Sequence, residues 1–98
     1  MILRIIVLEP VADELTEATH YYNNIQYGLG LKLLDEWESS IRKIQQSPEG
    51  YQKKYKNYRQ VLLNKFPYLI VYSIDKTTII VSRFINVRKH PKKRYLKQ

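Results

Sequence analysis

Residues 58–72 read YRQVLLNKFPYLIVY, two apolar runs on either side of a Phe-Pro-Tyr corner at 66–68. Runs rich in aliphatic and aromatic residues are typical of β-strands, and proline is tolerated where a strand begins or ends. A third run of this kind follows the turn residues Asp-Lys-Thr-Thr at 75–78. The C-terminal half of the chain therefore predicts three consecutive strands, over about 58–64, 68–74 and 78–86.

The first half of the chain predicts one strand followed by two helices. Residues 2–8 are almost continuously aliphatic, as in a strand of a sheet that is covered on at least one face. Glu9-Pro10 then starts a helix, because proline fits the first helical turn. The predicted buried stripe of this helix is Val11, Leu15, Ala18, Tyr22 and Ile25. A second helix over about 30–46 has the stripe Leu33, Leu34, Trp37, Ile41 and Ile44, and Tyr22 and Trp37 are interpreted as core residues.

The predicted element order is β-α-α-β-β-β, within a single domain of residues 1–98 that ends in a basic tail at 87–98. The short connection between the helices predicts an antiparallel helical hairpin. We expect an α+β fold in which this hairpin packs on one face of a twisted, antiparallel-rich sheet. Simple alternation along the last strand places Ile79, Val81, Arg83 and Ile85 on one face, and Ile80, Ser82, Phe84 and Asn86 on the other.

Charge is distributed unevenly along the 98 residues, whose formal net charge is +8. Residues 1–50 hold four Lys/Arg against eight Asp/Glu, and residues 51–98 hold thirteen against one. The second half therefore attracts polyanions or acidic protein surfaces. The chain has no cysteine and two distant histidines, so we expect no disulfide, metal or cofactor. The apolar run at the N-terminus is too short for a signal peptide or a membrane span, which predicts a cytoplasmic protein with no membrane partner.

Three segments, in this order, resemble the RelE/ParE superfamily of toxins from type II toxin–antitoxin systems, which includes plasmid stabilisation proteins. They are the pattern PVADELTEATHYY at 10–22, the corner within 58–72, and Asn-Val-Arg-Lys-His-Pro at 86–91. The resemblance covers nearly the whole chain and implies a toxin that a cognate antitoxin neutralises. In the ParE-like branch the toxin poisons DNA gyrase by binding it. In the RelE-like branch the toxin cuts mRNA on the ribosome without a metal ion.

The RelE-like branch needs a proton acceptor, a proton donor and several cations around one phosphate. Carried over by position, the resemblance assigns these roles to Arg59, to Arg88 or Lys89, and to Tyr95. The nuclease hypothesis adds Arg83, a charged residue among the aliphatic residues of the last strand, so its candidate set is Arg59, Arg83, Arg88 and Tyr95. Arg83 has two open interpretations: an arginine paired with a helix carboxylate or reaching solvent from the sheet edge, or a cation on an anion-binding face. The family pattern is incomplete here, because an apolar residue stands at Leu69 and asparagine, which cannot exchange a proton near neutral pH, stands at position 86. The sequence therefore favours the ParE-like branch.

Two further groups of residues are candidate contact sites. Salt-sensitive contacts to a polyanion are predicted for residues of the 51–57 loop and of the tail: Lys53, Lys54, Lys56, Lys89, Lys92, Lys93 and Arg94. These charges are also consistent with an ordinary solvated surface, or with a nucleic-acid-binding module that is no longer toxic. The apolar positions Ile25, Leu29 and Leu31 are predicted to be exposed on the helical hairpin and to anchor the antitoxin.

Overall fold

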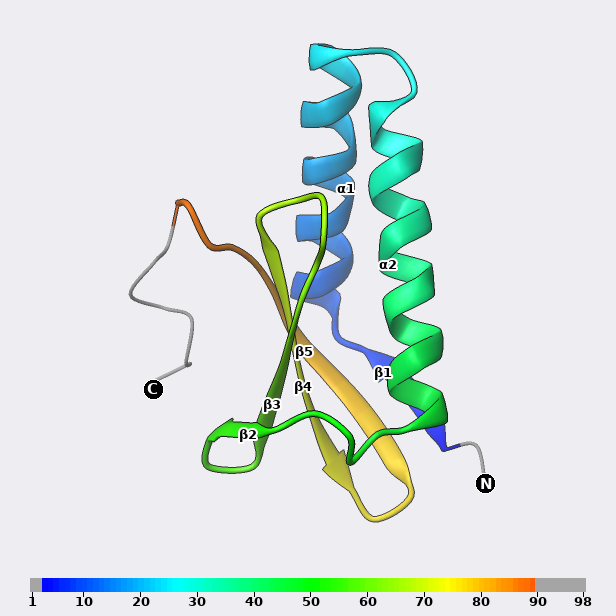
Figure 1. Cartoon of the computed structure of the whole chain (residues 1–98), viewed down its shortest axis with the longest axis vertical. Coiled ribbons are helices and arrows are strands. Elements are labelled where there is room, and N and C mark those ends of the chain that lie inside the picture. Colours follow the sequence, from blue (N-terminus) through cyan, green and yellow to red (C-terminus); the bar gives the residue numbers. More distant parts are fainter. Residues whose placement is uncertain (1–2, 90–98) are drawn as a thin grey trace.

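The computed structural model describes residues 3–89, which form two helices and five strands (Figure 1). In chain order the elements are β1 (Arg4–Val7), α1 (Glu9–Ile25), α2 (Leu29–Gln46), β2 (Lys53–Tyr55), β3 (Tyr58–Leu62), β4 (Tyr68–Asp75) and β5 (Thr78–Asn86). The predicted elements are all present. The short strand β2 was not predicted: its residues were assigned to a loop, because two lysines and one tyrosine give no apolar run.

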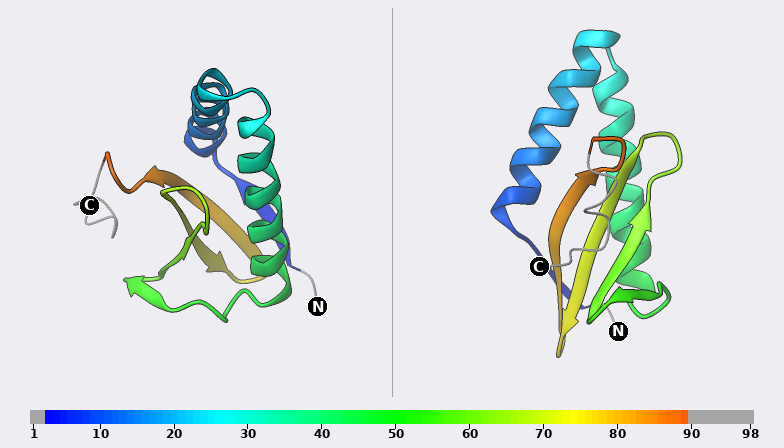
Figure 2. Two further views of the ribbon diagram at one scale, coloured as in Figure 1. Left: turned by 45° about the horizontal axis from the view of Figure 1, so that its top comes forward. Right: turned by 90° about the vertical axis from the view of Figure 1, so that its left-hand side faces the viewer.

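The five strands form one sheet in the order β1-β5-β4-β3-β2. β1 pairs with β5 in parallel, and the other neighbouring strands are antiparallel. Parallel neighbours need a long crossover, and the helical hairpin lies within this crossover between β1 and β5. Both helices lie on the same face of the sheet (Figures 1 and 2), which confirms the predicted α+β architecture.

The helices approach each other closely at Gly30, near the hairpin connection. The Gly30 backbone N–H donates a hydrogen bond of 2.8 Å to the Asn23 side-chain oxygen. A Cβ atom at Gly30 would lie 2.7 Å from the backbone oxygen of Thr19, so a larger residue would push the helices apart. Gly28, in the connection itself, has φ +88°, a conformation that glycine adopts without strain.

The main core lies between the helical hairpin and the sheet. Its fully buried members are Val11, Leu33, Ile44, Ile70, Tyr72, Ile79 and Val81. Phe84 of β5 packs edge-to-face on Trp37 of α2, at 5.4 Å between ring centroids, and stacks on Tyr68 at 4.5 Å. The Glu36 carboxylate of α2 accepts hydrogen bonds from the backbone N–H groups of Asn64 and Lys65. These contacts hold the Phe-Pro-Tyr corner against α2.

A β-bulge in β5 changes which residues face the helices. Tyr72 pairs with Val81 and Val71 pairs with Arg83, so Ser82 is an extra residue on β5. Val81 and Phe84 therefore both face the helices, while Arg83 faces the opposite side. The face assignment predicted by simple alternation is wrong beyond Val81, because the bulge shifts the period by one residue.

Deleting Ser82 should leave the fold intact. Without this residue Val81, Arg83 and Phe84 follow regular alternation and keep their present faces, and the β1 pairing at 78–81 is untouched. We expect the free energy of unfolding to fall by less than about 2 kcal/mol in chemical denaturation. As a control, deleting Ile80 should unfold the protein, because it moves Ile79 or Val81 out of the core. Unfolding by the Ser82 deletion, or folding of the Ile80 deletion, would contradict this account of the bulge.

The burial of β1 and of α1 differs in part from the prediction. β1 is an edge strand: Ile5 packs against the core, as expected for a sheet covered on one face, but Ile6 and Val7 are substantially exposed. On α1, Val11 and Ala18 are buried as predicted. Ile25 is 59% exposed, so its assignment to the buried stripe is wrong and its predicted exposure on the hairpin is right. The reason is visible in Figure 1, where the closed end of the helical hairpin extends beyond the sheet. Neither described helix is long and apolar enough to cross a membrane.

Candidate functional site

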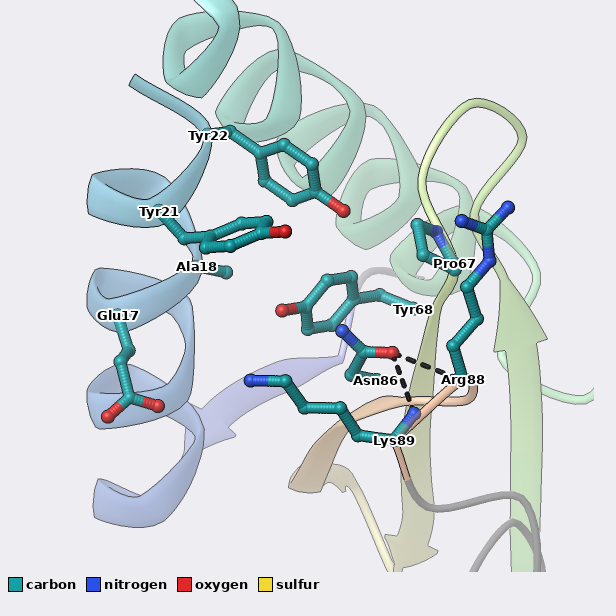
Figure 3. A pocket seen from close by; sticks show the side chains of 9 residues that line it. All are labelled: Glu17, Ala18, Tyr21, Tyr22, Pro67, Tyr68, Asn86, Arg88 and Lys89. Carbon is teal, nitrogen blue, oxygen red and sulfur yellow. Dashed lines mark hydrogen bonds between the residues drawn. The ribbon is translucent and has the colours of Figure 1, made fainter. Parts of the chain in front are cut away.

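A cleft opens between the second half of α1 and the end of β5, beside the Phe-Pro-Tyr corner (Figure 3). Its volume is about 280 Å³. The lining residues come from three separate segments of the chain: Glu17, Ala18, Tyr21, Tyr22, Pro67, Tyr68, Asn86, Arg88 and Lys89. Aromatic rings, two cations and one carboxylate thus meet in a single concave site.

The turn after β5 positions the two cations. The Asn86 side-chain oxygen accepts hydrogen bonds from the backbone N–H groups of Arg88 (2.9 Å) and Lys89 (3.2 Å). This asparagine turn ends the strand and reverses the chain at the cleft. Val87 adds a backbone hydrogen bond of 2.9 Å to the carbonyl of Pro67, which fixes the turn to the corner. The side chains of Arg88 and Lys89 then lie on either side of the cleft (Figure 3).

The aromatic wall of the cleft is built on the core. The ring of Tyr22 packs edge-to-face on Tyr21, with 5.0 Å between centroids, and on Phe66 at 4.9 Å. Tyr68 lies 6.5 Å from Tyr22 and stacks on the buried ring of Phe84. Because each ring contacts at least one other ring, the wall is preorganised and needs little ordering when a ligand binds.

Two phenols of the cleft remain neutral hydrogen-bond donors at neutral pH. Burial raises the pKa of Tyr22 above 10.0, and the neighbouring Tyr21 raises it further, although the Arg88 charge opposes this shift. Burial also raises the pKa of Tyr68, against the effect of its hydrogen bond with Asn86. Phenols with raised pKa values are poor general bases at neutral pH. The cleft is therefore suited to binding more than to proton transfer.

The arginines predicted for a nuclease site do not converge. Arg59 pairs with Tyr72 on the helix-facing side of the sheet, and its guanidinium donates hydrogen bonds to the backbone carbonyls of Glu49 and Tyr51. Arg83 lies on the opposite face, where the bulge places it. It lines a shallow pocket with Glu14 of α1, and no ion pair forms between them.

Arg88 is in the cleft, and Tyr95 lies outside the described residues. The helix-free face of the sheet carries the buried apolar cluster of Leu69, Val71 and Ile85. Within residues 3–89 no group of acidic or histidine side chains could hold a metal ion. In residues 3–89, Arg59 therefore has a structural role as a hydrogen-bond donor. The three candidate arginines in this part of the chain do not surround a common site.

The predicted polyanion contacts fall in two places. Lys53 and Lys54 lie on β2 and Lys56 lies in the turn after it, and all three side chains are exposed. The pairing of Lys53 with Arg59, and of Arg59 with Tyr72, puts this group at the other end of the sheet from the cleft. Lys89 lines the cleft. The candidates Lys92, Lys93 and Arg94 lie outside the described residues.

The residues predicted to anchor an antitoxin differ in exposure. Ile25 and Leu31 are 59% and 64% exposed, as an anchor requires. Leu29 is half-buried and packs against the main core, so its predicted exposure is wrong. Tyr27 between the helices was not predicted, although it is 97% exposed at the closed end of the hairpin. The position of Tyr27 in the short connection between two predicted helices could have indicated its exposure.

The tyrosines of the cleft were also missed as a site. Tyr22 was assigned to the core, and it does pack on the core, but its hydroxyl reaches the cleft (Figure 3). Tyr68 was recognised only as part of the strand corner. The available signal was a combination of two features: the adjacent tyrosines at 21–22, and Asn86 placed shortly before the cations Arg88 and Lys89. Bringing these segments together requires the fold.

Comparison with known proteins identifies the fold. No protein-family model matches the sequence, and no curated protein matches it in sequence. A chain in a solved structure described as the chromosomal ParDE TA system from P. aeruginosa superposes with a TM-score of 0.77. The match covers 87% of this chain and 96% of that chain, at 15% sequence identity. The protein thus has a RelE/ParE-like fold, as its three segments predicted.

Proposed function

We propose that this protein is the toxin of a type II toxin–antitoxin pair, and that it arrests growth by binding an intracellular target. The observation that carries this proposal is the shared fold, which extends over 96% of a chain from a ParDE system. Because one fold can host several functions, the site must decide between binding and catalysis. The proposal therefore rests on the fold for the class of protein and on the site for its mode of action.

The arrangement of cations favours a ParE-like toxin over a RelE-like nuclease. Arg59 and Arg83 face opposite sides of the sheet, and an apolar cluster occupies the helix-free face. RNA cleavage without a metal needs several charged groups around one phosphate, whereas a toxin that acts by binding does not. DNA gyrase, the target implied by the ParE-like resemblance, is accordingly the proposed target.

A cognate antitoxin would neutralise the protein by covering the helical hairpin and the cleft. Ile25 and Leu31 offer exposed apolar anchors on the hairpin, and Tyr21 extends this apolar surface toward the cleft. A helix or extended segment of the antitoxin that reaches all three would bury them together. Such a partner should also raise the solubility and yield of the protein when the two are co-expressed.

The proposal predicts an ordered sequence of events when the protein is expressed in a bacterial host without an antitoxin. DNA replication should stop before protein synthesis, a DNA-damage response should follow, and mRNA should remain intact. Growth, labelled-precursor incorporation into DNA and protein, and mRNA integrity report these events separately. The matched control is a variant that fails to fold, such as the Ile80 deletion, expressed at the same level.

Other outcomes distinguish the alternatives. Early collapse of translation with mRNA cut at ribosomes would replace the binding mechanism by a RelE-like nuclease. Unimpaired growth at confirmed expression would contradict an active toxin in that host. In that case binding to nucleic acid should be measured. Weak binding that is independent of sequence and falls steeply with salt concentration would favour a nucleic-acid-binding module.

A further inference from the structure

The charged groups of the tyrosine-lined cleft lie on both of its sides. Arg88 extends beside Pro67, whereas the side chain of Lys89 reaches toward α1, which carries Tyr21 and Glu17 (Figure 3). Negative charge extends along this helix, because both Glu14 and Glu17 contribute to the raised pKa of Tyr68. The cleft therefore holds one cation on each side, and carboxylates on α1 alone.

The two cations are available to a ligand. Both side chains are exposed, and their backbones are held by Asn86. The ammonium of Lys89 lies 6.0 Å from the ring centroid of Tyr21, a contact that needs no carboxylate partner. Among residues 3–89, neither Arg88 nor Lys89 forms an ion pair. A small anion in the cleft would therefore gain charge-assisted hydrogen bonds from these cations without displacing an internal partner.

The rest of the cleft suits an apolar group next to that anion. The rings of Tyr22 and Tyr68 supply flat apolar walls, and Ala18 and Pro67 complete the lining. Tyrosine and arginine are enriched where protein partners bind, because they offer a large contact area and hydrogen bonds at low entropic cost. The chemistry of the cleft thus combines an anion site with an apolar site.

We propose that this cleft binds an acidic side chain of a protein partner, with the carboxylate at Arg88 and Lys89 and a neighbouring apolar side chain against the tyrosine rings. The inference deepens the proposed function and rests on it for the identity of the partner, which is the antitoxin. The acidic residue would act as a charged anchor beside the apolar anchors of the helical hairpin.

The carboxylates on α1 favour a peptide over a nucleic acid as the ligand. A nucleic acid carries a negative charge at every nucleotide, so a strand that runs through the cleft would place further phosphates beside Glu17 and Glu14. A peptide with one acidic residue avoids this repulsion. The lysines of β2, which would extend a phosphate-binding track, lie at the other end of the sheet.

The test is a titration of the purified, isotope-labelled protein with two short peptides, followed by NMR. The peptides have the blocked sequences Ala-Leu-Glu-Leu-Ala and Ala-Leu-Gln-Leu-Ala, which differ only in the charge of one side chain. We expect the glutamate peptide to shift the amide signals of residues 86–89 and to bind about ten-fold more tightly, as a charge-assisted hydrogen bond predicts. R88Q with K89Q should remove this preference, whereas K54Q, on β2, should retain it.

A charge swap makes the test more specific. The double variant R88E with K89E should prefer a third peptide, which has lysine in place of the central glutamate. Equal binding of the glutamate and glutamine peptides, or no binding of either, would overturn the proposal. So would a single-stranded oligonucleotide that displaces the glutamate peptide from residues 86–89. None of these results depends on growth arrest. The proposal about the cleft and the proposal that the protein is a toxin can therefore be contradicted separately.

Discussion

Replacing Phe84 by alanine is expected to lower the free energy of unfolding by about 3–5 kcal/mol, the usual cost of removing a buried aromatic ring. Phe84 is 3% exposed and lies between Trp37 of α2 and Tyr68 of the corner. The substitution therefore removes apolar contacts to both layers and leaves a cavity between them. Since small domains are stable by only about 5–15 kcal/mol, this loss is a large fraction of the total free energy of unfolding.

Chemical denaturation followed by far-ultraviolet circular dichroism measures this change. F84L, which keeps most of the volume, should cost less than about 2 kcal/mol. L62A should change little, because Leu62 is 53% exposed on the helix-free face. A loss below about 1 kcal/mol for F84A would mean that the layers do not meet at this ring. If F84A still folds at low temperature, the glutamate peptide should bind it more weakly, because Tyr68 loses the ring on which it stacks.

The sequence was sufficient for the elements whose periodicity is strong. Three-to-four spacing located α1 and α2, and apolar runs located β3, β4 and β5. These signals are strong because an element that packs on one layer must be apolar at regular positions. These are every third or fourth residue of a helix and every second residue of a strand. The strand order, with β5 beside β1, was not predicted, because local patterns do not encode which strands become neighbours.

The predictions that failed depended on events outside the local pattern. The bulge at Ser82 is a pairing defect between two strands, so alternation within β5 alone cannot reveal it. As a result Arg83 was grouped with Val81, although the two lie on opposite faces. β2 exists because β3 offers an edge, and its own residues carry no strand signal. The cleft likewise joins residues that are more than sixty positions apart in the sequence, which only the fold brings together.

The separation of Arg59 from Arg83 shows why residue type alone is a weak guide to catalysis. Position on a strand suggested a catalytic cation, but the Arg59 guanidinium holds the loop at 49–51 through two backbone carbonyls. A cation that satisfies a half-buried carbonyl, here that of Tyr51, is costly to replace for structural reasons. Loss of toxicity on replacing Arg59 would therefore not by itself identify a nuclease, and mRNA integrity must be measured alongside growth.

Alkaline pH is expected to destabilise the protein through Tyr72. Its side chain is fully buried, and its hydroxyl donates a hydrogen bond of 2.6 Å to the carbonyl of Pro48. Burial raises the pKa of Tyr72 from 10.0 to about 12, although the nearby Arg59 charge opposes the shift. Since the unfolded chain releases this proton near pH 10 and the folded chain retains it, deprotonation favours unfolding. The contribution of Tyr72 is complete below pH 10 and is lost as the pH rises through about 12.

The expected loss is about 2–3 kcal/mol, because one pKa unit corresponds to about 1.4 kcal/mol. The measurement is the free energy of unfolding of the wild type and of Y72F at several pH values between 8 and 12. Below pH 10 the variant should be less stable by about 1 kcal/mol, since the Pro48 carbonyl loses its donor. Other groups titrate in both proteins and cancel in the difference. The advantage of the wild type should therefore shrink and reverse as the pH rises. A difference that stays constant would mean that water reaches the Tyr72 hydroxyl, and the joint between β4 and the loop after α2 would then be open.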